Sequence, residues 1–144
     1  MATIKSYTDI NQSKKLAEIL PLESADMYYD DIIDCVTGEL FIPDNGSTIM
    51  VGKGLSSSIA AWSLAALLAT LPNEIITDNR FECHYQIDIR KYDWYDNATL
   101  YQIAYGNNRG LSGSWHDMVN TGEKENLIDC CVQMIINLHE QKLL

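Results

Sequence analysis

The clearest pattern in the chain is the strict alternation of apolar and polar residues in FECHYQIDIR, residues 81–90. One side of this segment, drawn as an extended chain, carries Phe81, Cys83, Tyr85, Ile87 and Ile89. A repeat of two is typical of a strand with one face in the core and the other in water. The neighbouring TLYQIAY, residues 99–105, predicts the adjacent strand of an antiparallel sheet.

Two segments nearer the N-terminus also favour strands. ELFIPDNGSTIMV, residues 39–51, places Pro-Asp-Asn-Gly between two β-forming runs, which predicts a hairpin. ESADMYYDDIIDCV, residues 23–36, fits a helical repeat and a strand repeat equally badly. Its tyrosines and isoleucines favour a strand after Met27, and the helical alternative stays open.

Helical patterns lie near both ends of the chain. The first predicted helix begins at an N-cap, Thr8 or Asp9, and runs to about Leu20, where a proline follows. The last spans residues 122 to about 141, with Thr121 as its N-cap and two glutamates in its first turn.

The most apolar stretch is IAAWSLAALLATL, residues 59–71, which a proline follows. A bilayer span needs about 20 apolar residues, so these 13 predict a buried helix at about residues 58–71 and no membrane anchor. Either the domain itself covers this helix, or its ridge of alanines lets a second copy approach to form a homodimer. Trp62, near its start, is a candidate partner-binding residue because a large amphipathic ring suits an interface.

Together these elements predict an α+β fold. We expect an antiparallel sheet of about four to five strands packed against the Ala/Leu-rich helix and the C-terminal helix. A chain of 144 residues matches the size of one domain, so residues 1–144 are predicted to form a single globular domain.

Three segments carry a resemblance to known sequences: KKLAEILPLESADM, residues 14–27, AWSLAALLATLP, residues 61–72, and IDCCVQMIINLHE, residues 128–140. Their combination resembles a family of small uncharacterised proteins encoded by gut bacteria and their mobile elements. The resemblance runs over most of the chain but rests on apolar helix signatures. It therefore implies no activity, cofactor or catalytic residue.

The charge of the chain is −10, from 20 acidic and 10 basic residues. Seven acids and no Lys or Arg lie between Pro21 and Asn45. Direct nucleic-acid binding is not expected, because it requires cations that neutralise phosphates. The acidic stretch is either a solvated face or a surface that attracts a basic partner or imitates a phosphate backbone, with Asp30, Asp31 and Asp34 as candidate partner-binding residues.

The cysteines and the N-terminus predict a reducing compartment. Residues 1–15 lack the apolar core of a secretory signal, and the four cysteines show no disulfide framework. We expect a cytoplasmic protein with reduced cysteines. Cys83 and His84 point to opposite sides of their predicted strand, and no CxxC, HxH or HExxH occurs, so neither a metal nor another cofactor is predicted.

GSTIMVGKG, residues 46–54, superficially resembles a phosphate-binding loop. Five residues instead of four separate its first glycine from Gly-Lys, and glycine instead of Ser or Thr follows the lysine. The segment is therefore interpreted as a strand end that leaves through a loop.

GNNRGLSGSWHDMVNTG, residues 106–122, contains four glycines and no apolar repeat, so it predicts a long loop. Loops of this length are usually either functional or disordered. If the protein has a ligand site, we expect this loop to form one wall, with Asn108, Arg109, Trp115 and His116 as candidate ligand-binding residues.

These observations leave three hypotheses for function. The leading one is a non-enzymatic binding or accessory protein that acts through a protein partner or through self-association. The alternative is an acidic DNA-mimicking or inhibitory protein of a mobile element. The third is a small enzyme that uses the 106–122 loop.

Overall fold

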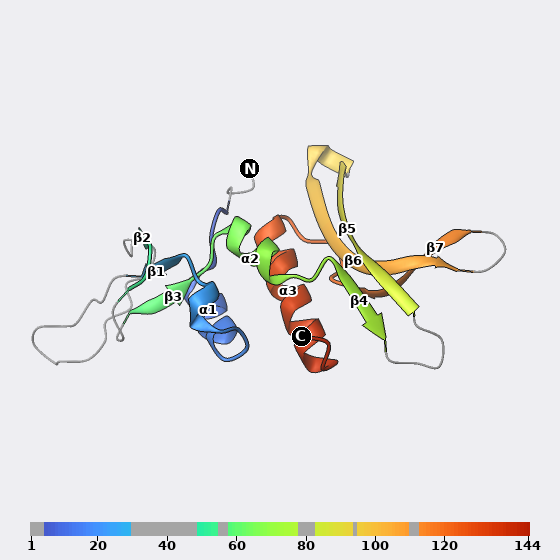
Figure 1. The fold of residues 1–144 in the computed structure, drawn as a ribbon. Coiled ribbons are helices and arrows are strands. Elements are labelled where there is room, and N and C mark those ends of the chain that lie inside the picture. The colour runs from blue at the N-terminus through green and yellow to red at the C-terminus, as the bar shows by residue number, and fades with distance from the viewer. Residues whose placement is uncertain (1–4, 30–48, 55–57, 78–82, 94, 110–112) are drawn as a thin grey trace, which may run out of the picture. The chain divides into compact units, whose positions relative to one another are not determined.

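The computed structural model describes residues 5–29, 49–54, 58–77, 83–93, 95–109 and 113–144. The described residues form three α-helices and two antiparallel sheets, of three and four strands (Figure 1). The predicted α+β class is thus confirmed. The chain divides into two compact units, Ser6–Leu67 and Leu68–Leu144 with Met1–Lys5, each described by itself below. The expected single domain stays a prediction.

A small sheet forms the centre of the Ser6–Leu67 unit. Its order is β2-β1-β3, and β1 pairs antiparallel with both neighbours. Helix α1 packs on β3. The elements of this unit are α1 (Ile10–Ala17), the 3-10 turn η1 (Leu22–Ser24), β1 (Met27–Tyr29), β2 (Ile49–Val51) and β3 (Ile59–Ala61). The strand expected after Met27 is confirmed as β1, which begins at Met27 itself.

Helix α1 begins as the sequence predicts. The Asp9 carboxylate accepts a hydrogen bond from the Gln12 backbone N–H at 2.8 Å, and the Gln12 side chain accepts one from the Asp9 N–H at 3.2 Å. This reciprocal cap satisfies two donors that a helix start leaves free. The helix ends at Ala17, earlier than the expected Leu20.

The predicted helix at about residues 58–71 is wrong in its first part. Residues Ile59–Ala61 form strand β3, and helix α2 spans only Leu64–Thr70. The Ser63 hydroxyl accepts a hydrogen bond from the Ala66 N–H at 3.2 Å, so Ser63 caps the helix and separates it from the strand. The predicted burial holds only in part, because Leu67 is buried whereas Ala65 and Ala69 are exposed.

Trp62 anchors the Ser6–Leu67 unit from inside. Its side chain is 0% exposed, and its indole N–H donates to the Ser24 hydroxyl at 2.9 Å. Its backbone exchanges hydrogen bonds with Thr8, whose carbonyl also accepts one from the Tyr29 hydroxyl at 2.6 Å. Burial leaves no Trp62 surface for a partner.

The second unit contains the four-stranded sheet, in the antiparallel order β4-β5-β6-β7. The expected neighbouring strands at residues 81–90 and 99–105 are confirmed as β5 and β6, and both extend further. The strands are β4 (Glu74–Thr77), β5 (Cys83–Asp93), β6 (Thr99–Arg109) and β7 (Ser114–Asn120), with the 3-10 turn η2 (Tyr95–Asn97) between β5 and β6.

Helix α3 (Leu127–Glu140) packs on β6 and buries Ile103 and Tyr105. The predicted C-terminal helix is confirmed, but its N-cap is Asn126, which accepts from the Asp129 N–H at 2.9 Å. Thr121 is not the cap. It is buried, and its hydroxyl accepts the Ile103 N–H at 3.1 Å, so it belongs to the sheet.

The predicted long loop at residues 106–122 is also wrong. Its first residues complete β6, and most of the remainder is β7, so the segment is largely a hairpin. The glycines misled the prediction because one of them is a packing residue. A Cβ on Gly106 would lie 2.3 Å from the His116 carbonyl oxygen and 2.8 Å from Trp115 Nε1, so only glycine lets this strand approach.

Several predictions fall partly or wholly outside the described residues. These are Asp30, Asp31, Asp34, Cys35 and all but the last strand of the 39–51 hairpin, which is β2. In the described part of the chain, no helix is long and apolar enough to cross a membrane.

Candidate functional site

The Ser6–Leu67 unit contains an open pocket of about 720 Å³. Pockets of roughly 300–1,000 Å³ are typical of ligand sites. Residues of α1, η1 and the small sheet line it, so segments far apart in the sequence contribute. Its apolar surface includes Ala17, Leu22, Ala25, Met27, Tyr28 and Ala60.

Strand pairing explains why apolar residues meet at this pocket. Tyr28 on β1 lies opposite Met50 on β2 and opposite Ala60 on β3, so the three occupy one row across the sheet. Tyr28 and Ala60 line the pocket, and Met50, at 40% exposure, continues the row into solvent. The next residue, Tyr29, points to the other face and is buried.

The segment Gly52–Lys53–Gly54, which fails as a phosphate-binding loop, forms one wall of the pocket. A Cβ on Gly54 would lie 2.4 Å from the Ser58 hydroxyl oxygen and 2.8 Å from the Tyr28 ring. Gly52 has φ of +110°, which side-chain-bearing residues rarely adopt. The glycines therefore let the backbone lie against the tyrosine, and the lysine between them lines the pocket.

Charged residues of both signs also line the pocket: Lys14 on α1, Glu18 at its C-cap, Glu23 in η1, and Lys53 after β2. All four are exposed. None of them forms an ion pair with another residue that the structure describes. The pocket thus combines an apolar surface with charges that have no counterpart within the described chain.

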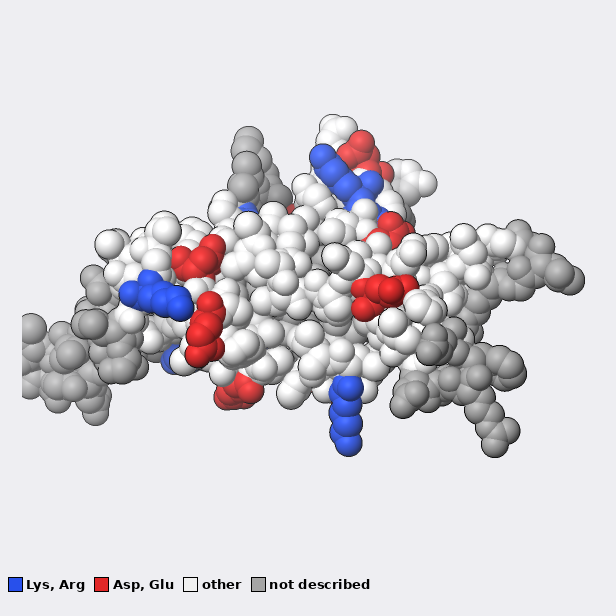
Figure 2. Space-filling model, viewed as in Figure 1, with Lys and Arg blue, Asp and Glu red and all other residues white. Residues whose placement is uncertain are grey.

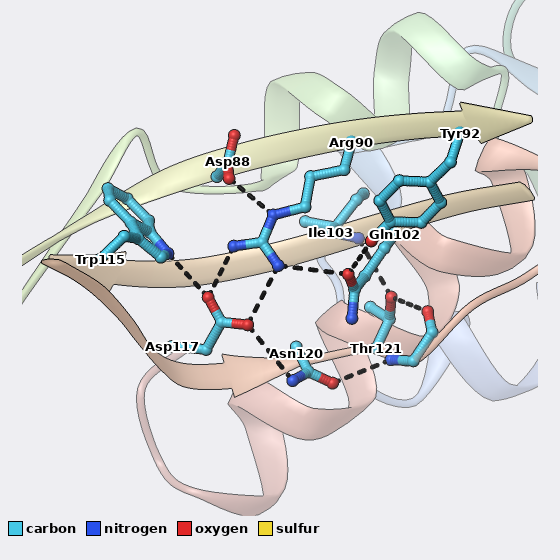
Figure 3. A network of polar contacts seen from close by, with 10 residues as sticks. Asp88, Arg90, Tyr92, Gln102, Ile103, Trp115, Asp117, Asn120 and Thr121 are labelled. Atoms are coloured by element: carbon cyan, nitrogen blue, oxygen red, sulfur yellow. Dashed lines mark hydrogen bonds and ion pairs between the residues drawn. The ribbon is translucent and has the colours of Figure 1, made fainter.

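A second cluster of polar side chains joins β5, β6 and β7 in the other unit (Figure 3). Arg90 donates to Asp117 through both terminal nitrogens, at 2.7 and 3.1 Å, and its Nε donates to Asp88 at 2.7 Å. Arg90 also donates to Gln102 at 3.2 Å, and the Tyr92 hydroxyl donates to the same amide oxygen. We call these residues, with Trp115, the Arg90 network.

The ion pair sets the protonation of the Arg90 network. Hydrogen bonds from Arg90 hold the pKa of the Asp117 carboxyl below its usual range, and Trp115 adds to this by donating its indole N–H at 2.7 Å. The hydrogen bond from Asp117 in turn raises the pKa of Arg90. Because these polar groups satisfy one another across three strands, the network braces the sheet.

Of the predicted ligand-binding residues, the structure brings Asn108 and Trp115 together as cross-strand partners. Arg109 lies in β6 opposite Ser114. His116 follows Trp115 in β7, so strand alternation turns it to the other face of the hairpin. Trp115 is 37% exposed and belongs to the Arg90 network, so it and His116 lie on different faces of the hairpin.

Sequence reasoning missed the pocket in the Ser6–Leu67 unit. The available signal was the lysine between two glycines, which is unusual for a plain strand end. The pocket could not be inferred further, because α1, η1 and the small sheet meet only through tertiary packing.

The described residues form no metal-binding cluster, and two of the described cysteines are buried. No three His, Cys, Asp or Glu side chains come together there in a way that could hold a metal ion. Cys83, Cys130 and Cys131 are free thiols, the last two fully buried. Burial raises the pKa of Cys131 to about 12 and also raises that of Cys130, so both favour the unreactive thiol form.

The charge distribution in Figure 2 is relevant to the hypothesis of an acidic protein that imitates DNA. On the face shown, the described acidic and basic side chains are interspersed among uncharged atoms and form no continuous acidic field. The candidate residues Asp30, Asp31 and Asp34 lie outside the described part of the chain.

Comparison with models of protein families, with curated proteins and with solved structures gave no significant match. The resemblance to small proteins of gut bacteria therefore stays a prediction from sequence.

Proposed function

We propose that this protein is a non-enzymatic binding protein that holds an apolar segment of another polypeptide in the pocket of the Ser6–Leu67 unit. The observation that carries this proposal is the pocket itself, with its apolar surface and its volume of about 720 Å³. Apolar burial provides affinity without any reaction, at roughly 25 cal/mol per Å².

The exposed residues around the pocket favour a polypeptide over a small molecule. Leu22, at the pocket edge, is 58% exposed. Met50 on β2, in the same row as Tyr28 and Ala60, is 40% exposed. A small molecule that filled the pocket would leave these side chains in water, whereas a chain segment that lies across it would cover them.

The proposal is tested by filling the pocket. Ala60→Phe places a large ring where Tyr28 and Ala60 line the cavity, and Ala17→Phe does the same from α1. Ala65→Phe is the matched control, because Ala65 is exposed on α2 and does not line the pocket. Phage-displayed random peptides are selected on the wild type, and affinities are then measured by fluorescence polarisation.

We expect selected peptides to lose at least about tenfold in affinity for both pocket variants, a loss of 1.4 kcal/mol. Binding to Ala65→Phe should be unchanged. Circular dichroism establishes that all three variants fold. Selected peptides that bind the pocket variants as tightly as the wild type would refute the proposal.

A further inference from the structure

We infer that the polypeptide held in the pocket carries an acidic and a basic residue on either side of its apolar residues. This inference rests on the proposed function and specifies its partner. The observation behind it is that the charges lining the pocket are balanced, with two lysines and two glutamates among the described lining residues.

The order of charges along α1 and the residues after it determines at which end of this wall the partner's acidic and basic residues bind. Lys14 on α1 and Glu18, the C-cap residue whose backbone is still helical, lie four residues apart, and both line the pocket. Such residues share a helix face and are separated by about 6 Å along the axis. Glu23 follows in η1, so this wall runs from positive to negative along the chain. A complementary segment offers its acid to Lys14 and its base to the glutamates.

The same charges argue against other ligand classes. Glu18 and Glu23 repel a phosphate or a fatty-acid carboxylate that approaches the lysines. Lys14 and Lys53 likewise repel a purely cationic ligand. A polypeptide readily combines an apolar centre with charges of both signs, and a zwitterionic lipid headgroup is the competing source that the experiment has to separate.

The size of the effect follows from exposure. All four side chains are exposed, and each exposed ion pair changes affinity by roughly 1.5-fold to 5-fold. Charge therefore selects the partner sequence, while the apolar contact provides most of the affinity. The preference should weaken in high salt, because screening acts strongly on exposed charges.

The test uses a panel of capped octapeptides. Two central positions are drawn from Leu, Ile, Met, Phe and Trp, and the flanking positions are Asp and Lys, two Asp, two Lys or two Asn. Affinity is measured by fluorescence polarisation at low salt. We expect the Asp and Lys peptides to bind about threefold to tenfold tighter than either like-charged set.

Charge-reversal variants locate the preference. Lys14→Glu with Lys53→Glu should shift it to the two-Lys peptides, and Glu18→Lys with Glu23→Lys should shift it to the two-Asp peptides. The control for the first pair is Lys15→Glu with Lys91→Glu, which makes the same charge change at exposed residues that do not line the pocket. That control should keep the wild-type preference.

The outcomes separate the inference from the proposed function. Equal affinity for all charge sets, or a preference that the pocket variants leave unchanged, refutes the inference alone. No binding by any peptide below about 1 mM refutes the proposed function as well. Dodecylphosphocholine micelles that bind tighter than every peptide, with the same sensitivity to charge reversal, would assign the pocket to a lipid headgroup and overturn both.

Discussion

The two polar regions of this protein differ in where their charges find partners. In the Arg90 network, the guanidinium, both aspartates and the Trp115 indole satisfy one another across three strands. In the pocket of the Ser6–Leu67 unit, the lysines and glutamates form no ion pair within the described chain. The first region connects three strands of a sheet, and the second lines the pocket in which we propose that a partner binds.

The largest effect is expected at the buried tryptophan that supports the pocket unit. Trp62→Ala removes a fully buried indole and leaves the Ser24 hydroxyl without its donor. We expect a loss of about 3–5 kcal/mol in unfolding free energy, measured by urea denaturation. The exposed Trp115→Ala is the comparison and should cost much less. Equal losses of unfolding free energy for the two variants would contradict the difference between the buried Trp62 and the exposed Trp115.

The next effect concerns Gly106, against which Trp115 of the Arg90 network packs. Gly106→Ala introduces a methyl group that meets the His116 carbonyl and the Trp115 ring. Because a backbone atom cannot turn aside, we expect a loss of about 1–3 kcal/mol in unfolding free energy. The matched control is Gly113→Ala, where a Cβ meets nothing within 4 Å and only the positive φ is unfavourable. A smaller loss at Gly106 than at Gly113 would contradict the close packing.

A smaller effect depends on pH. Because Arg90 lowers the folded pKa of Asp117, the ionised carboxylate stabilises the folded protein above the unfolded pKa of about 3.9. This contribution is lost as the pH falls through the lower, folded pKa. Asp117→Asn should therefore cost about 1 kcal/mol at pH 7 and progressively less below pH 3.9. Urea denaturation at several pH values measures the difference, and a constant difference would contradict the ion pair.

The smallest effects are expected at the pocket charges. Lys14→Ala and Glu18→Ala remove exposed side chains that have no ion-pair partner in the described chain. Thermal denaturation should show changes within about 0.5 kcal/mol for each. A loss above about 1 kcal/mol would show that these charges serve the fold, and the comparison between the two regions would fail.

The sequence allowed much of the fold to be predicted, because local signals were strong where strands alternate or caps are present. The strands around Tyr85 and Ile103 and the cap at Asp9 follow from such signals. The signals failed where tertiary packing gave a residue another use. Gly106 indicates a loop by residue type, but in the structure it lets Trp115 lie against β6. Ile59–Ala61 fit a helical pattern, but in the structure they pair with β1.

The candidate site was harder to predict than the fold. Its lining comes from α1, η1, the strands β1 and β3 and the Gly52–Lys53–Gly54 segment, and no single segment contains a chemical motif. The predicted site at 106–122 combined residues that strand alternation places on opposite faces, as at Trp115 and His116. Residue type alone could not distinguish the Arg90 network, whose polar groups bind one another, from pocket charges that form no ion pair with any residue the structure describes.

Peptide binding at the pocket is tested most sharply by NMR mapping of a selected peptide on the isotopically labelled protein. The largest backbone amide shifts should occur at pocket residues, with Gly54, Ile59 and Ala60 as reporters. Amides of Arg90, Gln102 and Asp117 in the Arg90 network should move little, because their side chains already bind one another. Largest shifts at the Arg90 network, with the pocket amides unmoved, would contradict the account.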